Sequence, residues 1–197
     1  MKKLISILLV LTLAFAFAAC GESANQPTAT SEPTEEPAVA ITDSLELLTN
    51  VWAAFAEDQK FAIAGGDYNN SVMDAPGTFN VSDTESLDSM LGVAADSAAL
   101  IDGAASMMHM MNANTFTCGA YHIADAANVQ AFADALKENI MNRQWMCGFP
   151  DTLVIYTVGG EYVVSAFGAA DIITNFKANL ATAYAGAELL YEENLAA

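Results

Sequence analysis

Residues 152–167 read TLVIYTVGGEYVVSAF, and this stretch decides the fold class. Two runs of β-branched and aromatic residues, 152–158 and 161–167, flank the pair Gly159-Gly160. Consecutive glycines accept the positive φ angles of the two-residue turns that join hairpin strands. The stretch therefore predicts an antiparallel β-hairpin.

A helical pattern follows the hairpin. Apolar residues recur at helical spacing and predict a helix that continues or restarts towards residues 189 and 190; they are Ile172, Ile173, Phe176, Leu180 and Tyr184.

The segment before the hairpin has the same order of elements. Residues 98–111 and 115–123 predict two strands, and residues 125–145 predict a helix. The apolar positions of that helix match those of the later helix at an offset of 44; they are Val129, Phe132, Leu136 and Ile140. Two such units predict an α+β fold with a four-stranded antiparallel sheet and the helices on one face. Chance agreement between two amphipathic helices is the alternative to a true repeat.

Two capping boxes predict two more helices, which would cover an edge or an end of the sheet. Asp43-Ser44-Leu45-Glu46 opens a pattern through residue 57, and Ser82-Asp83-Thr84-Glu85 opens a short one that ends at Gly92. The intervening residues 59–81 show no sustained period and predict an irregular segment, with one short strand at 61–64. Irregular segments of this length are often functional.

The first nineteen residues have the architecture of an export signal. Basic residues at 2 and 3 precede an apolar run, 4–17, and Ala18-Ala19 stand directly before Cys20. This pattern resembles a bacterial lipoprotein signal, in which Cys20 is lipidated and becomes the first residue of the mature chain. Phe17 departs from the usual aliphatic residue of such signals. A plain signal peptide or a membrane helix is the alternative.

A tether follows the lipidated cysteine. The stretch GESANQPTATSEPTEEPAVA, residues 21–40, combines three prolines with Ser, Thr and Glu and lacks apolar periodicity. Such a composition favours an extended, disordered segment. The sequence thus predicts a signal peptide at 1–19, a lipidated cysteine and tether at 20–40, and a single α+β domain at 41–197. Cation binding by Glu32, Glu35 and Glu36 is the alternative role of the tether.

The charge balance excludes one class of partner. The chain carries 6 Lys and Arg against 24 Asp and Glu, a net charge of −18. Removal of residues 1–19 leaves four basic residues and every acid, so the net charge becomes −20. Nucleic acids are bound by clustered basic residues, which this chain lacks. The acidity also disfavours contact with anionic lipid surfaces, so we expect the domain to stand off the extracytoplasmic face of the cell membrane.

The whole layout resembles the small lipoproteins of anaerobic Gram-positive bacteria that carry a domain of unknown function. The likeness rests on the Cys20 signal, the acidic tether and the order of elements, together with the segments MMNANTFTCGAYHIADAANVQAFADALKENI (110–140) and GGEYVVSAFG (159–168). The resemblance implies a location and a shape, and it carries over no catalytic residue.

Two cysteines remain after Cys20 in the predicted exported domain. An even pair in such a domain suggests a disulfide, here between Cys118 and Cys147. The alternative is two buried free thiols. A zinc site is less favoured because no CxxC or HxxH motif supplies further ligands.

The run Met107-Met108-His109-Met110-Met111 is the most unusual local feature. On a strand Met107, His109 and Met111 share a face, and thioethers and imidazole are ligands suited to Cu(I). The alternative is that the methionines fill gaps in the core.

The sequence offers little enzymatic machinery. Only two histidines are present, and the motifs of serine hydrolases, zinc proteases and phosphate-binding loops are missing from the sequence. Paired carboxylates from Asp151, Glu161 and Asp171 would permit a hydrolase, but acidic pairs arise freely in this composition.

The segment RQWMCGFPD, residues 143–151, has two interpretations. It predicts either a buried aromatic corner, closed by Arg143 on Asp151 or on an aromatic face, or a binding loop.

Together these features predict a membrane-anchored extracytoplasmic lipoprotein that acts as a binding or accessory module. It would need no cofactor and would take an unidentified protein or small-molecule ligand. A hydrolase and a Cu(I)-binding protein are the alternatives.

Overall fold

A computed structural model describes residues 40–111, 115–146 and 148–195. In these ranges eight strands form one antiparallel sheet in the order β2-β1-β4-β5-β7-β6-β8, and β3 also pairs with β4. The strands are β1 (Ile63–Gly65), β2 (Val72–Met73), β3 (Gly77–Phe79), β4 (Ile101–His109), β5 (Phe116–Ile123), β6 (Thr152–Val158), β7 (Tyr162–Gly168) and β8 (Glu188–Asn194).

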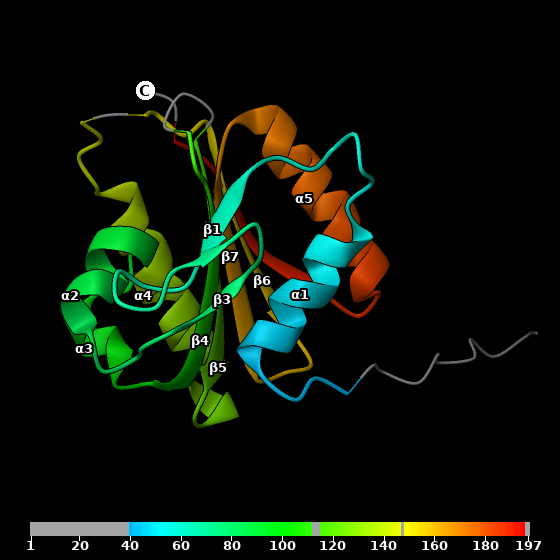
Figure 1. Cartoon of the computed structure of the whole chain (residues 1–197). Coiled ribbons are helices and arrows are strands. Elements are labelled where there is room, and N and C mark those ends of the chain that lie inside the picture. The colour runs from blue at the N-terminus through cyan, green and yellow to red at the C-terminus, as the bar shows by residue number, and fades with distance from the viewer. Residues whose placement is uncertain (1–39, 112–114, 147, 196–197) are drawn as a thin grey trace, which may run out of the picture. The chain divides into compact units, whose positions relative to one another are not determined.

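Helices cover both faces of the sheet. The helices α1 (Ser44–Ala54) and α5 (Ala170–Ala183) lie on one face, while α2 (Thr84–Ser86), α3 (Ala95–Ala98) and α4 (Val129–Met141) lie on the other (Figure 1). A π-helical turn, η1 (Leu87–Leu91), continues α2, and a 3-10 turn, η2 (Ala126–Asn128), leads into α4. Among the described residues no helix is both long and apolar enough to cross a membrane.

The sheet separates two hydrophobic cores. Alternate residues of a strand point to opposite faces, so Ala105 and Met107 of β4 pack under α1 and α5. Ala104 of the same strand packs in the other core, with residues of α4. Every residue of β7 is buried, because this central strand is covered on both faces.

The predicted four-stranded sheet is wrong, although the fold is α+β. The four expected strands are present as β4, β5, β6 and β7. The short strand expected at 61–64 is present as β1 and also joins the sheet, while β2 and β3 follow it within residues 59–81. A further strand, β8, replaces the expected helical continuation at Leu189 and Leu190. The strands β2, β3 and β8 are short or exposed, so their local sequence signal is weak, and pairing with β1, β4 and β6 determines their conformation.

The expectation that the two later helices share one face is also wrong. Phe132 of α4 packs on Tyr121 of β5, whereas Phe176 of α5 packs on Phe116 of the same strand. Residues 116 and 121 are an odd number of positions apart, so they point to opposite faces. Because β5 is largely buried on both faces, its sequence does not show on which face the following helix packs.

The first two helices are present, with changed ends and positions. Asp43 caps α1 by accepting a hydrogen bond from the backbone N–H of Glu46 at 2.8 Å, as the capping box predicts. The helix packs with α5 over a face of the sheet and not at an edge. In the second box Asp83 and not Ser82 accepts the capping bond, from the N–H of Ser86, and Gly92 ends the π-turn with φ of 76°.

Candidate functional site

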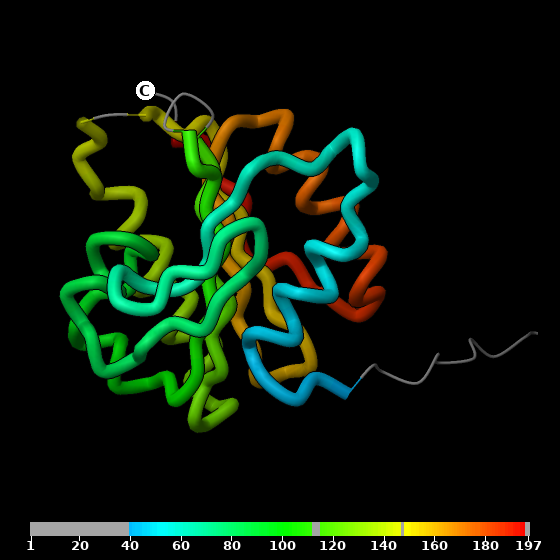
Figure 2. The backbone as a smooth tube through the Cα atoms, viewed as in Figure 1, coloured from blue at the N-terminus to red at the C-terminus, as the bar shows by residue number. Residues whose placement is uncertain are grey.

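The end of α4 leaves part of one sheet face without a helix. The sequence predicts this helix through residue 145, but it ends at Met141. The chain turns at Asn142, and residues 143–146 continue past the end of the helix without regular secondary structure (Figure 2). They run towards the end of the sheet where β4 ends at His109 and β5 begins, which we call the His109 end.

A row of four residues across neighbouring strands forms the floor of this region. Ala64 of β1 pairs with Met108 of β4, which pairs with Thr117 of β5. Thr117 in turn pairs with Phe167 of β7. Because these residues are in register on one face, they form a continuous surface of apolar groups with one hydroxyl.

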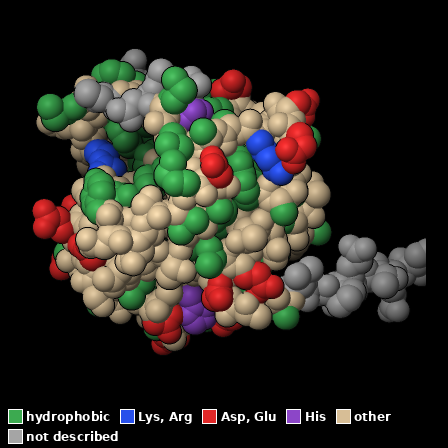
Figure 3. Space-filling view, in the orientation of Figure 1, with side chains coloured by type: hydrophobic (Ala, Val, Ile, Leu, Met, Phe, Trp, Pro, Cys, Tyr) green, Lys and Arg blue, Asp and Glu red, His purple; other side chains and the backbone are tan. Residues whose placement is uncertain are grey.

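Three segments form the walls of a cleft above this floor. The lining includes Tyr68 from the loop after β1, Ser89 and Met90 from the π-turn, and Arg143, Trp145 and Met146 from the segment after α4. The cleft has a volume of about 560 Å³. A smaller cavity of about 140 Å³ adjoins it, shares its Met108 and Thr117, and adds Met111 and Phe116. Figure 3 shows the hollow at the upper left, with hydrophobic side chains and one positive charge at its border.

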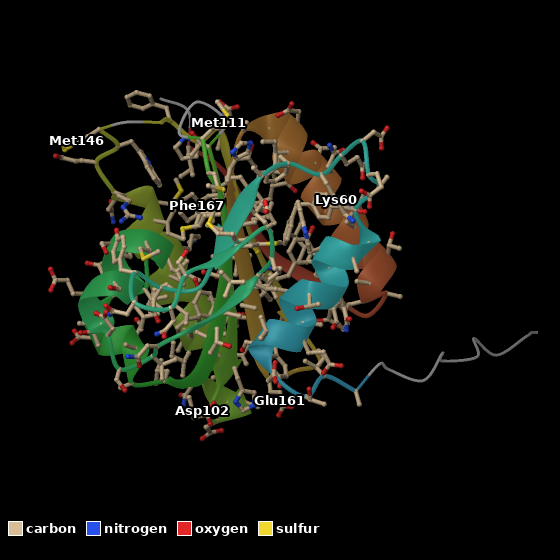
Figure 4. The ribbon with its side chains drawn as sticks, viewed as in Figure 1. Lys60, Asp102, Met111, Met146, Glu161 and Phe167 are labelled. Carbon is tan, nitrogen blue, oxygen red and sulfur yellow. The ribbon has the colours of Figure 1, made fainter. Side chains whose placement is uncertain are left out.

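Large apolar side chains stand exposed at the border of the cleft. Tyr68 is 73% exposed and Met146 is 89% exposed. Met146 points outward at the top left of Figure 4, whereas Phe167 lies in the interior behind it. Large apolar side chains seldom gather on the exposed surface of a domain, so the border is a candidate binding surface.

Arg143 is fixed at the wall of the cleft by two kinds of contact. Its Nη2 atom donates hydrogen bonds to the carbonyl oxygens of Asp88, at 3.1 Å, and of Ser89. Its guanidinium carbon lies 5.3 Å from the centre of the Trp145 ring, a cation–π contact. Arg143 therefore connects the segment after α4 to the π-turn across the cleft.

Asp67 holds the loop that carries Tyr68. The buried carboxylate accepts hydrogen bonds from the backbone N–H groups of Asn69, Asn70 and Asn80, at 2.8, 2.9 and 3.0 Å. Desolvation raises the pKa of Asp67, but these bonds and the Asn70 amide outweigh it, so the pKa lies below its usual value. The loop is thus stabilised by an ionised carboxylate.

His109 lies where the floor meets the smaller cavity. Its ring stacks on Phe61, with ring centres 4.6 Å apart and planes 7° apart. Its Nδ1 atom accepts a hydrogen bond from the N–H of Met111 at 2.9 Å. Burial lowers the pKa of His109, and an accepting Nδ1 requires the neutral ring with its proton on Nε2.

The structure does not bring the three proposed copper ligands into one site. Met107 is fully buried in the core under α1 and α5, and it lines neither cavity. Met111 is 60% exposed. The Nε2 atom of His109 carries the proton, so it has no lone pair for a metal ion in this tautomer. Among the described residues no group of three or more His, Cys, Asp and Glu side chains is placed to hold a metal ion.

Of the three cysteines, the structure describes only Cys118. Cys118 has no exposed surface and no disulfide partner among the described residues, and burial raises the pKa of its thiol well above the usual value. Its proposed disulfide partner Cys147 lies outside the described residues, and so does Cys20. The disulfide and the lipidation therefore stay predictions.

The three proposed hydrolase carboxylates do not form one site. Asp151 precedes β6 at the His109 end, where it accepts a bond from the N–H of Ala170, next to Asp171. Glu161 precedes β7 at the opposite end of the sheet, beside Asp102 and far from Met111 (Figure 4). There His122 hydrogen-bonds to Asp102 and lies 3.9 Å from Glu161.

The segment 143–151 fits the binding-loop interpretation better than the buried corner. Arg143 lies over an aromatic face, that of Trp145, as the corner interpretation allowed, but Met146 and Phe149 are 89% and 72% exposed, so the segment is not a buried corner. The floor residues Ala64, Thr117 and Phe167 carry no sequence signal of a site, because they are ordinary strand residues whose meeting depends on register. Tyr68 lies in the irregular segment 59–81, and the length of that segment was its only signal.

No protein-family model, no curated protein and no solved structure matches this chain, so the cleft itself is the basis for inferring function.

Proposed function

We propose that the chain is a lipid-anchored extracytoplasmic binding module whose cleft takes up a small ligand with an apolar or aromatic body. The proposed anchoring is supported by the signal pattern that ends at Cys20 and by the resemblance to small lipoproteins. The proposed binding is supported by the cleft.

One observation carries the binding role. The chain holds 24 Asp and Glu residues, yet none of the described residues that line the cleft is acidic. The lining instead presents methionine and aromatic side chains with a few hydrogen-bonding groups. A surface that leaves out the chain's dominant polar residue type is suited to a ligand that needs apolar contact.

The size and construction of the cleft suit a small molecule. Ligand pockets commonly measure about 300–1,000 Å³ and combine apolar walls with a few polar groups, a range that includes this cleft. Its floor is built on paired strands and is rigid, whereas the methionine side chains of the walls adapt their shape to a ligand. A hydrolase is less favoured, because Glu161 lies at the opposite end of the sheet from Asp151 and Asp171, and none of the three lines the cleft.

A fluorescence titration tests the binding role. We would use the mature chain, residues 20–197, with Cys20→Ser so that no lipid or detergent is present. Trp52→Phe leaves Trp145 at the cleft as the remaining tryptophan of the two. Titration with N-phenylnaphthylamine, an uncharged aromatic dye, should give saturable energy transfer from Trp145.

A pair of variants then locates the bound dye. Thr117→Phe fills the floor and should weaken binding by about tenfold or more, which corresponds to the loss of a well-packed apolar contact. Thr182→Phe adds the same ring on the exposed side of α5, across the sheet, and should leave the affinity within about twofold. Equal effects of the two variants, or no saturable transfer, would contradict the proposed function.

A further inference from the structure

Arg143 differs from the other basic residues of the described ranges. Three lysines each lie within 4.0 Å of a glutamate oxygen: Lys60 with Glu57, Lys137 with Glu193 and Lys177 with Glu192. Arg143 forms no ion pair with any carboxylate in the part of the chain that the structure describes. In a domain with so large an excess of acids, an arginine without an acidic partner is unexpected.

The contacts of Arg143 leave part of its guanidinium available to a ligand. Only Nη2 donates hydrogen bonds to described residues, and both acceptors are backbone carbonyls of the π-turn. The ring of Trp145 covers the group from one side. The side chain is half-buried and lines the cleft, so its remaining N–H groups are held in place beside the apolar floor.

An anion bound in the cleft would be favoured despite the net charge of the domain. The charges of distant exposed carboxylates are screened over about 8 Å at physiological ionic strength. A charge-assisted hydrogen bond to a partly buried guanidinium acts at contact distance, in surroundings of low polarity where it is strong. The described lining contains no acidic side chain, so no carboxylate of the cleft wall itself repels an anion there.

We infer that the ligand of the cleft is a small organic acid, with an apolar or aromatic body on the floor and one anionic group, such as a carboxylate or a sulfonate, at Arg143. This inference rests on the proposed function and extends it to a class of ligand. The apolar body contacts Met108, Thr117 and Phe167, and the acidic group lies towards the wall where Arg143 meets Trp145.

Two dyes with the same aromatic body separate the inference from the proposed function. N-phenylnaphthylamine is uncharged, and anilinonaphthalenesulfonate adds one sulfonate to the same ring system. Both would be titrated against the mature chain with Cys20→Ser and Trp52→Phe. The Arg143→Gln variant should weaken binding of the sulfonate dye by about tenfold or more beyond any change that it causes in binding of the uncharged dye.

Two further variants control for charge and for folding. Lys60→Gln removes the same charge away from the cleft, so both dyes should keep their affinities within about twofold. Arg143→Lys restores the charge without the planar donor group, so the sulfonate dye should regain part of its affinity. The uncharged dye reports in every variant whether the cleft is intact.

Each result has one meaning. If Arg143→Gln weakens both dyes equally, Arg143 only connects the π-turn to the segment after α4, and the inference is wrong. If Arg143→Gln changes neither dye, the inference is again wrong, while the binding role survives. If the uncharged dye does not bind, or if its affinity is unchanged by Thr117→Phe, the proposed function is wrong. The inference, which depends on it, is then wrong as well.

Discussion

The Nδ1 atom of His109 accepts a hydrogen bond from the backbone N–H of Met111, 2.9 Å away, while the ring stacks on Phe61. The hydrogen bond requires the neutral ring, and the stacking favours it. Burial also lowers the pKa of His109. A histidine whose pKa is lower in the folded than in the unfolded chain takes up a proton more readily on unfolding.

The stability of the domain should therefore depend on His109 below neutral pH. Its contribution is complete above the unfolded pKa of about 6.5 and is lost as the pH falls below that value. We expect the urea midpoint to fall between pH 7.5 and pH 5.5 in the wild type, and to fall less in His109→Gln. A His109→Gln profile identical to the wild type would refute this role.

Asp67 should be among the acidic side chains on which stability depends most. Asp67→Ala leaves backbone N–H groups of Asn69, Asn70 and Asn80 without their acceptor and should lower the free energy of unfolding by about 1–3 kcal/mol. Asp58→Ala changes an exposed residue and should stay within about 0.5 kcal/mol. Urea denaturation at pH 7 measures both.

The dependence of stability on pH below neutrality gives a second test of the contribution of Asp67. Because the folded pKa of Asp67 is lowered, its contribution is complete above the unfolded value of about 3.9 and is lost as the pH falls through the folded pKa. The difference in stability between the wild type and Asp67→Ala should therefore shrink in acid. A difference that is independent of pH would show that the ionised form is unimportant.

Gly92 should not tolerate a side chain. Its φ of 76° is unfavourable for other residues, and a Cβ atom would lie 2.5 Å from Cγ1 of Ile140. Gly92→Ala should cost about 1–3 kcal/mol of stability in thermal or urea unfolding. Gly186 has open space around its Cα, so Gly186→Ala should change stability by less than about 0.5 kcal/mol. Equal costs at the two positions would contradict this account of the π-turn.

Cys118 should resist alkylation in the folded domain. The thiol is fully buried and its pKa is raised well above the usual value, so a maleimide should not modify it at pH 7.5. After unfolding in urea without a reductant, the free thiol that the structure describes should react. Modification that occurs only after a reductant is added would instead support the predicted bond to Cys147, and peptide mass analysis distinguishes the outcomes.

Lipidation of Cys20 should determine where the protein is found. In a bacterium that processes lipoproteins, we expect the wild-type chain in the membrane fraction, with a diacylglyceryl group on an N-terminal Cys20. Cys20→Ala should move the protein out of that fraction, because two acyl chains supply the anchoring free energy. A wild-type product that keeps residues 1–19, or that lacks the lipid, would contradict the proposed location.

The elements that sequence patterns predicted well are those with strong local signals. Gly159-Gly160 between two β-branched runs and Asp43 before a helical period each determine their own conformation. The strand β8 lacks such a signal, since its conformation follows from pairing with β6 and from contacts such as Lys177 with Glu192. The conformation of β8 is therefore determined by tertiary pairing and not by its local sequence pattern.

The candidate site was harder to predict for a related reason. Residues 142–145 fit a helical period, yet the backbone leaves the helix at Asn142 and Arg143 instead bonds to the π-turn. The floor depends on the register of four strands that are distant in sequence. The segment containing Arg143 and Trp145 could be recognised from its composition, but its partners Met108 and Phe167 could not.

The packing of α1 against α5 affects the order in which the chain can fold. Asn50 donates a hydrogen bond to the Tyr184 hydroxyl, 134 positions further along the chain, and Leu48 and Phe176 share the same core. In a chain that emerges amino end first from a translocation channel, α1 can pack on β4 and β5 before α5 has crossed, but the part of its apolar side that faces α5 stays uncovered until nearly the whole domain is out. Such long-range closure is slow. If the chain is exported as we propose, we expect this side of the amino-terminal helix to be a region where extracytoplasmic chaperones bind and where proteases cleave newly exported chains.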